Sequence, residues 1–365
     1  MKNFLWFAGA LALAAMYFQP GHWAMLGGLI LLIVAHEFGH WFVARALGFD
    51  VPTFSIGFGS NPRIVLGRFW GTQFQITPWL IGGYVKIDPS DANFQSKAIW
   101  KRGAVMVAGV TMNVLLAVAL MFVLFVGFGQ RDYAYQSVSI SGVSTTVTIA
   151  ADAGLRAGDE FVSVDGQTIA TPQDLQRVLG AHKGVPASIT VKRGADVLTY
   201  TVTPDKDGHI GIAIGGKVAP VYKKMGPLTA FTEAVKFNAN LLKQMFVGLG
   251  MMLKIVPPPA GAPEGATDMH GLVAIVQFGA MAFNDGLYSF LQMLVLISMN
   301  LAFFNILPIP MLDGGHVMFL GIEKLRGKPL ARQTQVAVSN LFFLLLILLM
   351  VWGLFNDVFH PVNFK

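Results

Sequence analysis

The stretch AHEFGHWFVA, residues Ala35 to Ala44, places two histidines and a glutamate inside an otherwise apolar run. The run extends from Trp23 to Ala44, and about 20 apolar residues are enough for a helix to cross a bilayer. Ionisable side chains are costly at membrane depth and usually serve a function there. The stretch therefore predicts a membrane-spanning helix that carries a functional site.

The spacing of the three ionisable residues favours a metal site. His36 and His40 are four positions apart, so a helix places both on one face, where they can hold one ion. Glu37 is rotated by about 100° from His36, which directs its carboxylate toward water rather than toward the ion. Imidazole suits Zn²⁺, and a carboxylate in this position can act as a general base. The alternative is a His–Glu cluster that only hydrogen-bonds to neighbouring helices.

The composition indicates a polytopic membrane protein. The 365 residues are 54% hydrophobic and 13% charged, whereas soluble domains average about 25% charged residues. The chain has no cysteine, which excludes disulfides, cysteine-ligated zinc and iron–sulfur clusters. The net charge of +6 is expected to orient the chain in the membrane. No nucleic-acid motif is present, so we expect no nucleic-acid partner.

Four core transmembrane helices are expected, with a possible fifth at the N-terminus. This N-terminal segment, Phe4–Phe18, is short and could instead be signal-like. The segments, in chain order, are Phe4–Phe18, Trp23–Ala44, Gly103–Phe128, Leu287–Leu307 and Leu341–Phe355.

The basic residues predict the orientation. Residues 45–102 and 308–340 are rich in Lys and Arg, and short loops of this kind stay in the cytoplasm. Residues 130–285 would then lie on the extracytoplasmic side. His40 lies close to Arg45, so the ionisable cluster is expected in the cytoplasmic third of the membrane.

The extracytoplasmic segment begins like a small α+β domain. Residues 136–149 alternate as strands do. They are followed by GLRAGDEFVSVDGQTI (154–169) and by a helix start at Thr171-Pro172. This pattern resembles a PDZ domain of the bacterial, circularly permuted kind. The resemblance implies that peptide or protein C-termini are its ligands.

A catalytic zinc ion needs a third protein ligand. The fourth span ends in NLAFFNILPIPMLDGGH (300–316), where prolines interrupt the helix. Irregular backbone at membrane depth is tolerated where it is surrounded by protein or lines a cavity, so this stretch is expected to line the site. Asp313 and His316 are both candidate ligands, and an ordinary helix-capping role for Asp313 is the alternative.

Taken together, HEFGH, the NxxPxPxLDGG pattern and a PDZ-like domain between them are similar to the site-2 protease family of intramembrane zinc metalloproteases. The similarity is to the regulator of sigma-E protease type, in a form with one PDZ domain instead of two. A further departure is Ala108-Gly109-Val110, where the family usually has Ala-Gly-Pro.

The resemblance implies roles for individual residues. His36, His40 and Asp313 would bind one Zn²⁺, and Glu37 would be the general base. A second set would hold the substrate: Asn305, Pro308 and Pro310 near the third ligand, and Gly57, Gly59, Gly82, Gly83, Tyr84 and Val85 in a β-structured loop that dips into the membrane. An unwound substrate needs partners for its backbone groups, and an exposed strand edge supplies them.

The sequence thus predicts an intramembrane zinc endopeptidase of the bacterial inner membrane. Its expected substrates are single-pass membrane proteins, such as anti-sigma factors of a stress response, or remnant signal peptides. The alternatives are a site-2 protease with a sporulation-type client, a catalytically inactive PDZ adaptor, and a zinc transporter. The expected segments are an N-terminal apolar segment (1–22), an N-terminal half of the membrane core (23–128), the PDZ domain (129–216), an amphipathic helix with a Pro-rich linker (217–267) and a C-terminal half of the membrane core (268–365).

Overall fold

The computed structural model describes residues 19–359, apart from residues 60, 88–91, 145–146 and 258–271. The segment Phe4–Phe18 and most of the Pro-rich linker lie outside the described residues. The chain forms two compact units. We call Met1–Gly127 together with Met225–Lys365 the membrane unit, and Phe128–Lys224 the inserted unit.

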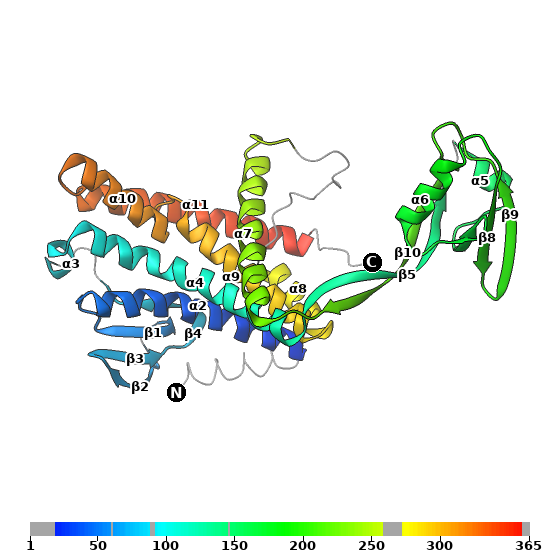
Figure 1. The fold of residues 1–365 in the computed structure, drawn as a ribbon. Helices are drawn as coiled ribbons and strands as arrows, with labels where there is room; N and C mark the ends of the chain where they lie inside the picture. The colour runs from blue at the N-terminus through cyan, green and yellow to red at the C-terminus, as the bar shows by residue number, and fades with distance from the viewer. Residues whose placement is uncertain (1–18, 60, 88–91, 145–146, 258–271, 360–365) are drawn as a thin grey trace. The chain divides into compact units, whose positions relative to one another are not determined.

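Within the described residues, four helices of the membrane unit are long and apolar enough to cross a bilayer (Figure 1). They are α2 (Pro20–Ala46), α4 (Ile99–Gly127), α9 (Leu287–Ile306) and α11 (Arg332–Phe359). The prediction of a polytopic α-helical membrane protein with four core spans is confirmed to this extent. The last helix begins at Arg332, upstream of the expected Leu341.

Helix α4 lies at the centre of the membrane unit and packs against both α2 and α9. Met25 and Leu32 of α2 meet Leu294 and Ile297 of α9 in one apolar cluster. Helix α11 makes its main contacts with α8 (Leu272–Asn284). Most of its large apolar side chains are exposed. Such exposure suits a helix that faces lipid, because lipid tails are as apolar as a protein core.

Helix α7 (Pro227–Met252) packs onto the membrane helices α4 and α9, and its position at the membrane surface stays a prediction. Its buried residues are Ala230, Ala234 and Asn238. Two of these are alanines, and small residues allow helices to approach closely. Figure 1 shows α7 standing across α4 and α9.

A four-stranded sheet lies alongside α2 in the membrane unit (Figure 1). Its strands are β1 (Thr53–Phe58), β2 (Ile64–Phe69), β3 (Thr72–Ile76) and β4 (Trp79–Val85), in the order β2-β3-β1-β4. Strands β1 and β3 are parallel, whereas β1 and β4 are antiparallel. Trp41 of α2 donates a hydrogen bond to Thr72, which donates in turn to the Val51 carbonyl. These bonds fix the sheet on the helix that carries the two histidines.

The remaining helices of the membrane unit are short. They are α3 (Ala92–Ser96) and α10 (Asp313–Arg326). Helix α10 packs on α4 and α9 and ends at Gly327, which adopts the left-handed conformation common at helix C-termini.

The inserted unit is an α+β fold built on a six-stranded sheet. The strand order is β10-β5-β6-β8-β9, and β7 pairs with β6. The elements are β5 (Gln130–Val143), α5 (Ile149–Asp152), β6 (Glu160–Val164), β7 (Gln167–Thr168), α6 (Pro172–Ala181), β8 (Ala187–Arg193), β9 (Asp196–Val202) and β10 (Ile212–Lys223). Thr171 caps α6 as its sequence indicates. Strand β10 continues beyond residue 216, the expected domain end, because it stays paired with β5 as far as Lys223.

An ion pair joins the buried Asp159 carboxylate to the partly exposed Arg193 guanidinium in the inserted unit. The Asp159 side chain is 1% exposed. It accepts two hydrogen bonds from Arg193, at 2.7 and 2.8 Å, and one from the Arg156 N–H. The Arg193 guanidinium holds the pKa of the Asp159 carboxyl below its usual range. Because the folded pKa is depressed, the pair stabilises the unit above the ordinary aspartate pKa of about 3.9, and that stability is lost as the pH falls through the depressed value.

We predict that Arg193→Met lowers the unfolding temperature of the inserted unit by several degrees at pH 7, because it leaves a buried carboxylate without its cation. Hydrogen exchange of β6 and β8 in the purified full chain, followed with temperature, measures the effect. Arg177→Met is the matched control, since Arg177 is 72% exposed in its pair with Asp174 and exposed pairs contribute little. The difference in unfolding temperature between wild type and Arg193→Met should become smaller in acid, where Asp159 is protonated and the pair no longer contributes. An equal effect of the two variants at pH 7 would contradict the prediction.

Candidate metal centre

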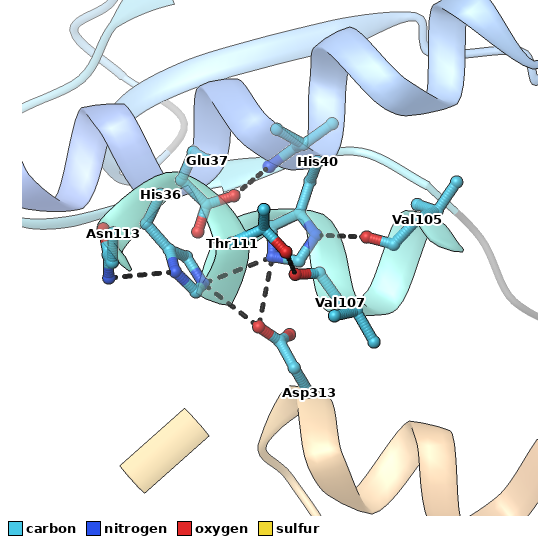
Figure 2. A network of polar contacts seen from close by, with 9 residues as sticks. His36, Glu37, His40, Val105, Val107, Thr111, Asn113 and Asp313 are labelled. Atoms are coloured by element: carbon cyan, nitrogen blue, oxygen red, sulfur yellow. Dashed lines mark hydrogen bonds and ion pairs between the residues drawn. The ribbon is translucent and has the colours of Figure 1, made fainter. Parts of the chain in front are cut away.

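Three candidate ligands converge where α2 meets the start of α10 (Figure 2). The Nε2 atoms of His36 and His40 are 3.2 Å apart. Oδ2 of Asp313 lies 3.2 Å from the first and 3.3 Å from the second. The helical spacing of the two histidines, inferred from the sequence, therefore brings both rings to one point, and Asp313 meets them there.

This triangle of atoms fits a zinc ion. A tetrahedral ion with bonds of about 2.0–2.2 Å places its ligand atoms roughly 3.3–3.6 Å apart. Oδ2 of Asp313 is buried and lies within 3.3 Å of the Nε2 atoms of both histidines. A buried carboxylate is costly unless its charge is paired, and a cation held by all three side chains would pair it.

His316, the competing third ligand, does not join this cluster within the described residues. It lies one turn further along α10, and its ring packs against Phe319, with the two centroids 6.3 Å apart. Asp313 is the residue of this pair that faces the two histidines.

The residues after Asp313 explain how its position is fixed. A Cβ on Gly314 would lie 2.2 Å from the Ile306 carbonyl oxygen, and one on Gly315 would lie 2.3 Å from that of Ile309. The two glycines therefore let the start of α10 pack directly on the Pro-containing connection that follows α9. Near the other end of α10, Glu323 forms a double hydrogen bond with the buried Arg102 of α4. Both contacts hold α10, and with it Asp313, in place.

Glu37 lies beside the cluster and is not part of it. Its Oε2 accepts a hydrogen bond of 3.1 Å from the Val85 N–H, at the end of β4. A carboxylate held next to a metal centre, but outside the ligand set, is placed to exchange protons with water at that centre.

The other predicted residues occupy two places. Asn305 lies in the last turn of α9, partly buried, and Pro308 and Pro310 lie in the connection to α10. On the sheet, Gly57 belongs to β1 and Gly59 follows it, while Gly82, Gly83, Tyr84 and Val85 belong to β4. Gly83 pairs with Ile56 and Tyr84 with Ser55. Strand β4 is therefore an edge strand whose end lies against Glu37.

Sequence reasoning missed two partners of the histidines on α4. The Val105 carbonyl lies 2.7 Å from Nδ1 of His40, and the Asn113 side chain lies 3.3 Å from Nδ1 of His36 (Figure 2). Asn113 could have been found as a polar residue within an apolar span. The Val105 contact involves only backbone, so no residue type indicates it.

The approach of α4 to the histidines requires glycine at position 109. A Cβ on Gly109 would lie 2.4 Å from Nε2 of His40 and 2.6 Å from Cε1 of His36. Gly103, on the same helix, is different, because a Cβ there would meet only Leu320, at 3.9 Å.

We predict that Gly109→Ala weakens zinc binding by at least about tenfold, because the methyl group displaces the ligand rings. Gly103→Ala should bind zinc like the wild type, since its methyl group fits. Competition with a chromophoric chelator on the purified full chain measures both affinities. Equal affinities for the two variants would show that the close approach does not shape the site.

The chain is similar to known proteins along nearly its whole length. The family model described as peptidase family M50 matches residues 24–349. Three relatives each bear the name "Putative zinc metalloprotease". One, from Brucella suis, is 29% identical, with 91% of this chain and 93% of the relative covered. One from Clostridium perfringens is 31% identical, and the match covers 91% of this chain and 96% of the relative. One from Nostoc is 32% identical, and the match covers 89% of this chain and 92% of the relative. The match confirms the resemblance to site-2 proteases and zinc as the metal, and the chain belongs to peptidase family M50, as a multi-pass membrane zinc metalloprotease.

Proposed function

We propose that this protein is an intramembrane endopeptidase that cleaves single-pass membrane proteins in the bacterial inner membrane. The observation that carries the proposal is the placement of the candidate metal centre on a spanning helix, next to the edge strand β4. A peptidase site at this place would meet its substrates within the bilayer.

In the proposed mechanism, His36, His40 and Asp313 would hold one zinc ion, which when bound would supply the Lewis acidity for attack by water near neutral pH. Glu37 accepts the proton of the attacking water and later delivers it to the leaving amine. The Val85 N–H orients the Glu37 carboxylate through the 3.1 Å hydrogen bond.

The substrate is proposed to unwind and to add as a strand to β4. The Lys86 N–H donates to the Thr53 carbonyl at the start of β1, whereas the preceding N–H, of Val85, faces Glu37. The edge of β4 that does not face β1 is thus the edge next to the proposed base. Strand addition there would pair the backbone groups of the unwound substrate, which have no water in the membrane core. Asn305, Pro308 and Pro310 are proposed to contact the substrate backbone from the α10 side.

We propose that the inserted unit is a single PDZ domain that docks or screens substrates on the extracytoplasmic side. The unit has a cavity of about 850 Å³, and its lining includes Ile212 and Ile214 of β10 and Gln176 and Leu179 of α6. β10 stands at the end of the described strand order, so an extended peptide C-terminus could pair with it. The regulator of sigma-E protease type, with regulated cleavage of anti-sigma factor-like substrates or remnant signal peptides, remains our proposal for the cellular role.

We predict that Glu37→Gln lowers cleavage of a reconstituted single-pass membrane substrate by about 100-fold or more, because the proton acceptor is lost. Zinc content should stay at the wild-type level, since Glu37 is outside the ligand cluster. Glu233→Gln is the control, because Glu233 lies on α7 and pairs with Lys236. In cells, Glu37→Gln should accumulate membrane-anchored fragments.

An inactive adaptor, or a zinc transporter, predicts a different result. In either case Glu37→Gln would leave fragment levels unchanged and the purified wild type would not cleave. Which fragments accumulate would identify the client, including a sporulation-type one.

A further inference from the structure

Asn113 is a buried polar residue on the spanning helix α4, and its side chain points at the candidate metal centre (Figure 2). Its Nδ2 lies 3.3 Å from Nδ1 of His36. Its Oδ1 is buried and has no hydrogen-bond partner among the described residues. The amide thus offers a donor to His36 while its acceptor contacts nothing polar.

The second histidine shows which tautomer the site uses. Nδ1 of His40 lies 2.7 Å from the Val105 carbonyl. A carbonyl can only accept, so Nδ1 of His40 carries the proton. Nε2 of His40 therefore keeps its lone pair, and this atom faces His36 and Asp313.

Among the residues that the structure describes, His36 has no such backbone partner, so it can adopt either tautomer. With the proton on Nε2, the ring can donate to Oδ2 of Asp313, 3.2 Å away, and Nδ1 accepts from the Asn113 NH₂ group. With the proton on Nδ1, Nε2 has a free lone pair for a cation, and Nδ1 needs an acceptor. The Asn113 NH₂ group cannot accept, whereas its Oδ1 can once the amide turns by about 180° about its last side-chain bond.

The backbone around Asn113 is held independently of this side chain. The Ser298 hydroxyl of α9 donates a 2.8 Å hydrogen bond to the Asn113 carbonyl oxygen, and Ser298 is fully buried. The amide can therefore turn while its Cα stays fixed next to His36.

We propose that Asn113 is a positioning residue that supports the metal-binding tautomer of His36. In that tautomer the Asn113 carbonyl oxygen accepts from Nδ1–H, whereas in the other tautomer the NH₂ group donates to Nδ1. The inference rests on the proposed metal site of His36, His40 and Asp313. Partners of this kind, placed behind a metal ligand, typically change metal affinity by about 10–100-fold.

The test compares zinc affinities of purified, metal-depleted full-length variants by competition with a chromophoric chelator. Asn113→Leu keeps the approximate size but removes both the acceptor and the donor, and should bind zinc about 10–100-fold more weakly. Asn113→Asp always presents an acceptor to Nδ1–H, and should bind zinc at least as tightly as the wild type. Asn238→Leu is the matched control, because Asn238 is also buried, with an unpartnered Oδ1, but lies on α7. Its zinc affinity should be unchanged.

Two results would overturn the inference. One is wild-type affinity in Asn113→Leu. The other is Asn113→Asp binding zinc ten times more weakly than the wild type, which would mean that the amide acts as a donor or only through its shape. The comparison of Asn113→Asp with the wild type tests the inference even if Asn113→Leu does not fold. His36→Ala tests the metal site separately from the role of Asn113, because retained zinc binding in that variant would overturn the proposed metal site itself.

Discussion

The site depends on close packing of three helices around two imidazole rings. Helix α4 passes the rings at Gly109, where a methyl group would come within 2.4 Å of a candidate ligand atom. Helix α10 starts at Asp313 and packs on the preceding connection through Gly314 and Gly315. Ordinary side chains at these positions would separate the helices, and the three ligand atoms would no longer lie within 3.3 Å of one another.

The same packing couples the proposed base to the proposed substrate strand. Glu37 follows His36 on α2, and its carboxylate accepts a hydrogen bond from Val85 at the end of β4. The sheet is itself fixed to α2 through Trp41 and Thr72. One helix therefore carries two candidate ligands and the proposed base, and holds the strand edge next to them.

Much of this could be predicted from the sequence, because the signals are local. The apolar lengths predict the four spans, and the four-residue spacing of His36 and His40 predicts a shared face. Residue patterns alone made Asp313 a candidate third ligand, but they left His316 as a competing ligand and helix capping as another role for Asp313. Contacts between distant segments were not predictable. Helix geometry that no local pattern encodes determines these contacts. Examples are the pairing of Arg102 with Glu323, the approach of Asn113 to His36 and the packing of α7 on the spans.

The three-ligand metal centre is tested most directly by the zinc content of purified Asp313→Ala and His316→Ala beside the wild type, by elemental analysis after dialysis against a weak chelator. We expect Asp313→Ala to lose zinc while His316→Ala retains one ion per chain, because Asp313 faces the two histidines and His316 does not join them among the described residues. Retention of zinc in Asp313→Ala together with its loss in His316→Ala would contradict this assignment.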